Sequence, residues 1–163
     1  MRGQADRRCT LGVSNRYTFA VSGPEILGNI YGMDTSGTGA QIDLVNFTLG
    51  IAPGGGSLDM AGAGMWLWNG STSTDLTGAT PLVGNSNPGP DQWAIVRTLP
   101  RDLDATLDPS EMMDITVQLA DSRSSLSPGD RFILEIRPAG GSPVVINGTA
   151  PSVIYPINLV GMS

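Results

Sequence analysis

Two stretches near the middle of this chain share one pattern that strongly restricts their local structure. Leu107–Val117 reads LDPSEMMDITV and Leu126–Ile136 reads LSPGDRFILEI. In each copy a leucine is followed by any residue, a proline, a small residue and an acidic residue, and then by alternating apolar residues. Proline presets φ for the first corner of a tight turn, and small and acidic residues suit the remaining corners. The pattern therefore predicts a tight turn followed by a strand, twice.

The apolar residues of these two segments define the expected core. Alternation with period two is typical of a strand with one buried face. We expect the two strands to be two sides of an antiparallel sheet and to bury their apolar residues together. Chance similarity of two hairpins is the alternative, and it leaves the strand prediction unchanged. The predicted core residues are Met113, Ile115, Val117, Phe132, Leu134 and Ile136.

Further short segments have the character of strands. Ile26–Tyr31 is the first, and Val45–Ile51 is the clearest in the first half of the chain. Ile42 and Leu44 fall on the opposite parity, which predicts either a bulge near Leu44 or burial of both faces there. Met65–Trp68 is apolar at every position, which favours a central or covered strand. The remaining predicted strands are Trp93–Arg97, Val144–Ile146 and Val153–Leu159.

These segments define an all-β fold class. Asn69–Pro90 is rich in Ser, Thr, Gly, Asn and Pro, and is expected to be a long exposed loop. We predict an antiparallel immunoglobulin-like β-sandwich of about eight strands in preference to a barrel. A chain of 163 residues is expected to hold one domain, residues 17–163. Residues 1–16 are interpreted as an irregular lead-in or a gene-boundary remnant outside the fold.

Composition excludes several classes of function. The formal net charge is −6, and the basic residues are nine arginines with no lysine, so a basic face for nucleic acid is not expected. Histidine, the commonest general base, is absent, and Cys9 is the only cysteine. Catalysis would have to depend on carboxylates alone. No apolar run approaches the ~20 residues of a membrane helix. We therefore predict no enzyme activity, no cofactor and no membrane segment.

Two groups of carboxylates are weighed as possible sites. Asp34-Thr-Ser-Gly37 resembles the Asp-Thr-Gly of aspartic proteases, but it has an extra residue and no second copy, so a turn is expected. Asp102, Asp104, Asp108 and Glu111 could hold calcium through oxygen ligands. They lack the glycine and the spacing of an EF-hand loop, so a solvated turn is predicted and no metal site. Paired carboxylates of the glycosidase type stay an open alternative.

Three N-x-[ST] sequons are candidate glycosylation sites. They begin at Asn46, Asn69 and Asn147. Asn69 is expected to be the most accessible because it opens a polar loop just after Met65–Trp68. Asn147 comes second, in a predicted hairpin turn with Gly148, and Asn46 third, on the polar side of its strand. The sequons predict a surface glycoprotein, although chance sequons are the alternative at each single site.

Taken in order, several segments resemble the outer domain of an archaellin, the filament subunit of the archaeal flagellum. Ile26–Gly32 is similar to the family's segment after its long N-terminal helix. Ile42–Gly54 resembles the first long strand, and Gly56–Asp59 resembles the turn that follows it. The closing part is matched by Leu126–Pro138, Gly140-Gly141 and Thr149–Pro151, so the likeness covers about residues 20–163.

The resemblance implies a structural role. The chain would be the surface-exposed domain of an archaellum filament subunit, extracellular and serving cell motility, and the intact family member is a homo-oligomer in a helical filament. An archaellin begins with a short basic leader and a long hydrophobic helix, and this sequence shows neither. We therefore expect the chain as written to be monomeric. The alternative function is an extracellular β-sandwich binding module or a type IV pilin-like adhesin.

Overall fold

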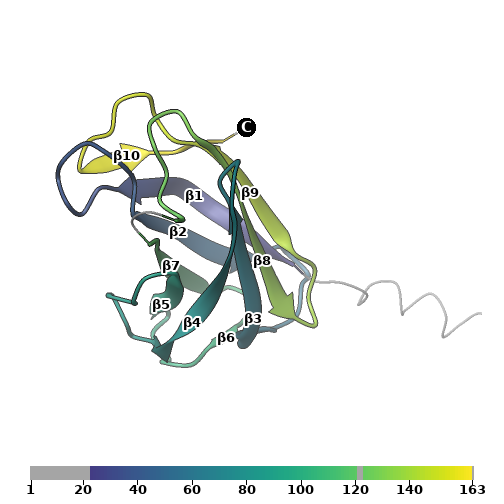
Figure 1. Ribbon diagram of the computed structural model, residues 1–163. Coiled ribbons are helices and arrows are strands. Elements are labelled where there is room, and N and C mark those ends of the chain that lie inside the picture. Colours follow the sequence, from purple (N-terminus) through teal and green to yellow (C-terminus); the bar gives the residue numbers. More distant parts are fainter. Residues whose placement is uncertain (1–22, 121–122, 163) are drawn as a thin grey trace, which may run out of the picture.

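Eleven strands make up the part of the chain that the computed structural model describes, residues 23–120 and 123–162, and no helix lies within it (Figure 1). The described residues accordingly contain no helix long and apolar enough to cross a membrane. The strands are β1 (Pro24–Met33), β2 (Leu44–Ile51), β3 (Leu58–Trp68), β4 (Ser73–Val83), β5 (Gln92–Leu99), β6 (Thr106–Leu107), β7 (Met112–Gln118), β8 (Arg131–Ala139), β9 (Val144–Thr149), β10 (Ile157–Leu159) and β11 (Gly161–Met162).

The strands form two layers with the core between them. The first sheet has the order β10-β1-β2-β7-β5, and the second has the order β4-β3-β8-β9-β11, with β6 against β3. The two sheets meet through β4, whose first half pairs with β3 and whose second half pairs with β5. The predicted all-β sandwich is confirmed. The sandwich is nearly closed on the side where β4 joins the two sheets. The β4–β5 pairing is parallel, although antiparallel pairs were predicted throughout.

The two strands of the repeated pattern lie in different sheets. β7 pairs with β2 and β5, whereas β8 pairs with β3 and β9. The expectation that they form two sides of one sheet was therefore wrong. Alternation identifies the buried face of a strand, but it carries no information about which strand lies alongside.

The core residues predicted from alternation are confirmed. All six are at most 1% exposed, and all belong to one hydrophobic cluster that spans both sheets. Leu107 and Leu126, the leucines that open each copy of the pattern, are fully buried in the same cluster. In each copy, the turn is therefore held in place by a buried leucine on one side and by buried strand residues on the other. The six residues are Met113, Ile115, Val117, Phe132, Leu134 and Ile136.

The turn of the first copy is closed by two reciprocal hydrogen bonds. The N–H of Glu111 donates to the carbonyl oxygen of Asp108 (3.0 Å), and the N–H of Asp108 donates to Glu111 Oε2 (2.9 Å). Pro109 occupies the second corner and Ser110 the third, with a φ of 73°. A positive φ after a proline is typical of a type II turn.

The second copy has the same geometry. The N–H of Asp130 donates to the carbonyl oxygen of Ser127 (3.0 Å), and the N–H of Ser127 donates to Asp130 Oδ2 (2.8 Å). Pro128 precedes Gly129, which has a φ of 82°. The two copies thus share the turn type and both of its bonds. They differ in that glycine adopts the left-handed conformation at no steric cost, whereas Ser110 is strained.

Three local expectations are corrected or resolved by the strands themselves. The stretch expected to be a long exposed loop contains β4, whose buried residues are Thr74, Leu76 and Ala79, with Leu82 and Val83 partly buried against the core. Leu44 and Val45 are both buried and the β2–β7 register is regular, so both faces are buried there and no bulge is present. The last alternating segment contributes only β10, and its apolar residues Ile157 and Leu159 face solvent.

Replacement of Phe132 tests the core. Phe132→Ala is expected to lower the free energy of unfolding by about 3–5 kcal/mol, because it leaves a cavity between the sheets. The control is Ile133→Ala at the next position, which is 37% exposed on the outer face and should cost below about 1 kcal/mol. Urea denaturation measures both, and equal losses would contradict the assigned faces.

The paired turns give a matched test of backbone strain. Ser110→Gly is expected to raise the free energy of unfolding by about 0.5–1 kcal/mol by relieving the positive φ. Gly129→Ala should lower it by about 1–2 kcal/mol for the converse reason. A Cβ at Gly129 meets nothing within 4 Å, so that loss reports conformation and not a clash. Thermal unfolding of the two variants should shift in opposite directions, and a shift in the same direction would refute the type II assignment.

Candidate functional site

Three of the four carboxylates noted in the sequence come together at one corner of the sandwich. Oxygens of Asp102, Asp108 and Glu111 all lie within 4.8 Å of one another. Asp104 is not part of this group, and its Oδ1 accepts the N–H of Thr106 (2.8 Å). Asp102 and Asp104 are exposed, but Glu111 is only 4% exposed. The expected solvated turn is therefore wrong for Glu111, because the type II turn directs its side chain inward.

The Glu111 carboxyl is electrostatically unusual. Its Oε2 accepts the N–H of Asp108, and its Oε1 is buried with no hydrogen-bond partner in the described structure. Burial raises the pKa of Glu111, and the nearby charges of Asp102 and Asp108 raise it further. Such a corner can share a proton, and its oxygens are also the ligands that a hard divalent cation prefers.

The raised pKa makes stability depend on pH. A carboxyl whose folded pKa lies above its unfolded value of about 4.3 stabilises the fold at low pH, and this contribution is lost as the pH rises through the folded pKa. Glu111→Gln keeps an oxygen for the Asp108 N–H and removes the charge. In EDTA, the variant is expected to be more stable than the original protein at about pH 7, with the difference shrinking towards about pH 4.

Urea denaturation at the two pH values measures this effect. Asp104→Asn is the control, because that carboxyl is exposed and lies outside the group, and its effect should change little with pH. A Glu111→Gln difference that is the same at both pH values would show that the buried charge is not the cause.

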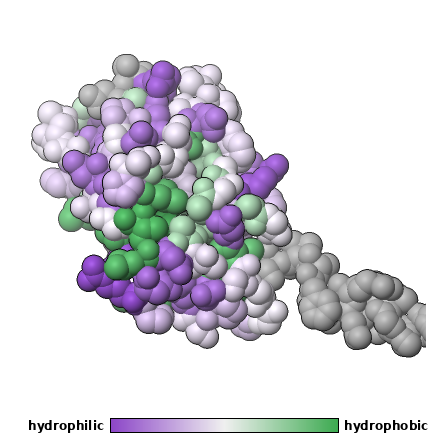
Figure 2. Space-filling view, turned by 90° about the horizontal axis from the view of Figure 1, so that it is seen from below, coloured by the Kyte–Doolittle hydropathy of each residue, from purple (hydrophilic) through white to green (hydrophobic). Residues whose placement is uncertain are grey.

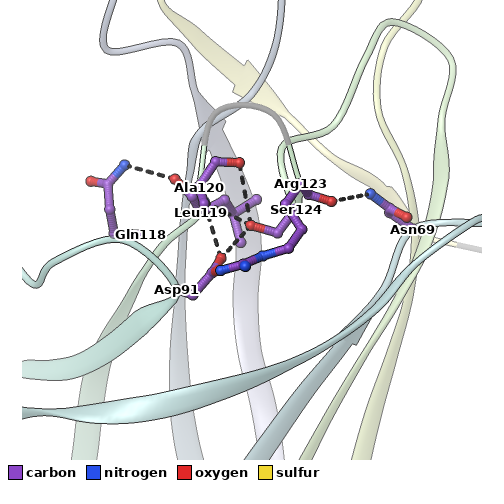
Figure 3. Close-up of polar contacts among 7 residues, drawn as sticks. All are labelled: Asn69, Asp91, Gln118, Leu119, Ala120, Arg123 and Ser124. Atoms are coloured by element: carbon purple, nitrogen blue, oxygen red, sulfur yellow. Dashed lines mark hydrogen bonds and ion pairs between the residues drawn. The ribbon is translucent and has the colours of Figure 1, made fainter.

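A second polar cluster fixes the end of the sandwich where β5 begins (Figure 3). Asp91 is buried, and its Oδ1 accepts the N–H of Ala120 (3.1 Å) and the hydroxyl of Ser124. Its Oδ2 pairs with Arg123. Burial acts to raise the pKa of Asp91, but the bonds from Ser124, Arg123 and Ala120 outweigh it and hold the pKa below its usual value. We infer a structural role for this cluster, because donors from Ala120, Arg123 and Ser124 converge on the one carboxylate.

The same cluster holds the first sequon candidate. The side-chain amide of Asn69 donates to the carbonyl oxygen of Arg123 (3.3 Å), as Figure 3 shows, and its Oδ1 accepts the N–H of Thr72 (3.0 Å). Asn69 is half-buried in a hollow lined by polar residues. Asn69 was expected to be the most accessible of the three, but its side-chain amide is hydrogen-bonded to the segment that contains Arg123.

The other two sequons lie on strands. Asn147 is exposed on the outer face of β9, not in the expected hairpin turn. The turn expectation was wrong because Gly148 is needed inside the strand, where a Cβ would lie 2.4 Å from the Phe132 ring. Asn46 lies on the polar side of β2 as expected, and its Oδ1 accepts the hydroxyl of Thr116 (2.5 Å).

The Asp34 loop is a turn, as expected. The Asp34 carboxylate accepts the N–H groups of Ser36 (3.0 Å), Gly37 (3.0 Å) and Gly39 (2.5 Å). The hydroxyl of Ser36 also donates to it, and these bonds lower the pKa of Asp34. The Asp34 carboxylate is thus used to order the loop. The nearby Asp43 carboxylate is used in the same way, because it accepts the N–H (3.0 Å) and the hydroxyl (2.7 Å) of Thr35.

One exposed apolar surface, on the outer face of the second sheet, was not predicted from the sequence. The segment Met65–Trp68 is central, as expected, since β3 pairs with β4 and β8. It is not covered on its outer side, where Trp68 is 43% exposed and Trp66 lies under the Arg137 guanidinium at 5.7 Å. Ile133 and Val145 of the neighbouring strands are also exposed. A segment such as Met65–Trp68, apolar at every position, is compatible with an exposed apolar outer face as well as with a covered one.

A further apolar patch lies at the end of the sandwich where β4 ends. In the view from below, apolar residues gather there and are bordered by hydrophilic ones (Figure 2). A groove of ≈390 Å³ at this end is lined by Val83, Val96, Leu99 and Leu103, with Arg101 at its edge. Leu103 is 60% exposed and has a φ of 64°, an uncommon conformation for leucine.

Comparison with known proteins shows which solved structures share this fold. No protein-family profile matches the chain, and no curated protein matches it by sequence. Solved structures do. The archaeal flagellum of Methanospirillum hungatei strain JF1 matches with a TM-score of 0.63 and 18% identity, over 94% of this chain and 79% of that one. The archaeal flagellin FlaB1 from Methanocaldococcus jannaschii matches with a TM-score of 0.62 and 14% identity, over 86% and 97%.

A third match is to an archaellum protein of another kind. The archaellum periplasmic stator protein FlaG from Sulfolobus acidocaldarius has a TM-score of 0.52 and 15% identity, over 78% of this chain and 99% of that one. At these identities the likeness shows the fold alone. The chain therefore has an archaellin-like fold, which confirms the resemblance seen in the sequence.

Proposed function

We propose that this chain is the surface-exposed domain of an archaellum filament subunit, extracellular and serving cell motility. The observation that carries the proposal is the match of the sandwich, across most of the chain, to an archaeal flagellum structure and to an archaeal flagellin. A structural role is supported by the chemistry of the described residues. Their buried aspartates, Asp34, Asp43 and Asp91, all accept hydrogen bonds from loop donors. Histidine is absent from the whole chain.

Exposed apolar surface supports assembly with further copies. Monomeric soluble proteins rarely expose large contiguous apolar patches, and such patches are typical of contact sites. This sandwich exposes Leu99 and Leu103 at one end and Ile157 at the β10 edge. A subunit that is surrounded by neighbours would cover surfaces that lie on different sides, and we propose homo-oligomerisation of this kind in the intact subunit.

N-linked glycans complete the proposal. Only 15% of the residues are charged, which leaves less charge than usual to keep an outward surface hydrated. Glycans at the sequons of Asn46, Asn69 or Asn147 would supply the missing polarity. The proposed protein is therefore a surface glycoprotein.

A second candidate is a stator component of the archaellum. It is favoured by the match to FlaG, which covers nearly all of that shorter chain. The lower TM-score, 0.52 against 0.63, ranks it below the filament subunit. The two candidates differ in where the protein resides, along the filament or at its base.

Immunogold electron microscopy of cells from the native source distinguishes the candidates. Antibody raised against the 163-residue chain is expected to label the length of the filament, and deletion of the gene should reduce swimming. Preimmune serum and the deletion strain are the controls. Label confined to the base would favour the stator, and intact swimming with unlabelled filaments would reject both candidates.

A further inference from the structure

Asn147 lies in one cross-strand row with an exposed tryptophan. Ile133 of β8 is in register with Asn147 of β9 on one side and with Trp68 of β3 on the other. All three side chains are exposed on the outer face of the second sheet. Neighbouring strands are about 4.7–4.9 Å apart, so Asn147 and Trp68 are separated by about 10 Å, with Ile133 between them.

A groove follows this row. It has a volume of ≈420 Å³ and is lined by Trp68, Arg131, Phe132, Ile133, Asn147 and Gly148. Its size falls within the range of about 300–1,000 Å³ that small-molecule sites occupy. The lining combines an indole face, an aliphatic floor and one guanidinium, so the groove suits a ligand with an apolar face and polar edges.

Packing in the core holds the sequon in position. Gly148 points inward, where any Cβ would collide with the Phe132 ring, so Asn147 and Thr149 both point outward. Arg131 of the neighbouring strand is in register with Thr149. The sequon asparagine therefore stands at the open end of a groove whose far wall is Trp68.

We propose that Asn147 carries an N-linked glycan whose first sugars lie along this groove, with a C–H face of a pyranose ring against the Trp68 indole. A pyranose has an apolar face and hydroxyl edges, which match the indole and Arg131. In the modification, Asn147 Nδ2 bonds to the anomeric carbon of a lipid-phosphate-linked sugar. The bond from that carbon to phosphate oxygen breaks, the lipid phosphate leaves, and the base of the transferase takes one amide proton.

The other two sequons lie in different surroundings. The Asn69 amide donates to the Arg123 carbonyl oxygen, and the hollow around it is lined by polar residues with no aromatic side chain. Asn46 also lines a groove, of ≈460 Å³, with Tyr31 and Arg97, but Asn46 is half-buried, whereas Asn147 is exposed. The structure thus favours Asn147 over Asn69, the reverse of the order that loop position alone suggests. The inference rests on the surface location in the proposed function, because the transferase acts on exported chains.

Two measurements on protein purified from its own source test the proposal, with the same chain made in a bacterial host without glycosylation as the reference. Glycopeptide mapping is expected to find the sugar on Asn147. Acrylamide quenching of tryptophan fluorescence should be weaker in the glycosylated protein, because the sugar shields Trp68, whereas Trp93 is buried in both. Asn147→Gln from the native host should lose the shielding, and Asn69→Gln should keep it.

Either of two results would overturn the inference: an unmodified Asn147, or a modified Asn147 with quenching equal to that of the bare chain. Trp68→Phe, at an exposed position, should abolish the difference between glycosylated and bare protein, and a difference that persists also counts against the groove. These outcomes are separate from the proposed function. Filament labelling with a bare Asn147 refutes this inference alone, and a glycosylated Asn147 without filament labelling refutes the filament role alone.

Discussion

The fold depends on two strands, β7 in the first sheet and β8 in the second, that bury their apolar residues in one core. Each strand enters the core directly from a type II turn, and the leucine before each turn is buried beside the strand residues that follow it. The turn fixes which residues of the strand point inward, because a shift by one residue would expose the whole apolar set. The same turn, used once in each sheet, therefore sets the register of one interior strand in each layer. The remaining strands pack around these two.

Carboxylates order the loops around this core. Asp34 collects N–H groups of its own loop, Asp91 collects donors from the segment after β7, and Glu111 and Asp130 close the two turns. Backbone N–H groups that leave a strand must find acceptors, and a carboxylate offers several lone pairs at once. The acidic balance of the chain is thus partly structural. Glu111 is the exception, because burial leaves one of its oxygens without a partner.

Strands with clear alternation of apolar and polar residues are predicted from the sequence, and strands whose inward side chains are small or polar are not. β2, β7 and β8 are evident because their inward residues are large and apolar. β4 is not, since its inward positions include Thr74 and Ala79, and polar residues surround them. A bulge after Ile95 turns Arg97 outward, although strict alternation would place both on one face. The Trp68 groove depends on which strands lie beside β3, and that information is absent from any single segment.

The two outer faces of the sandwich have different capacities for binding. On the first sheet, Thr48 donates to Asp114 (2.7 Å), Arg97 pairs with the same carboxylate, and Thr116 donates to Asn46. These groups are already satisfied, so a partner that displaced them would gain little. The second sheet instead exposes Trp68 and apolar neighbours, whose removal from water contributes about 25 cal/mol per Å². The centre of the second sheet can therefore be covered without breaking side-chain hydrogen bonds, whereas the first sheet exposes apolar residues such as Ile157 and Leu159 at its β10 edge.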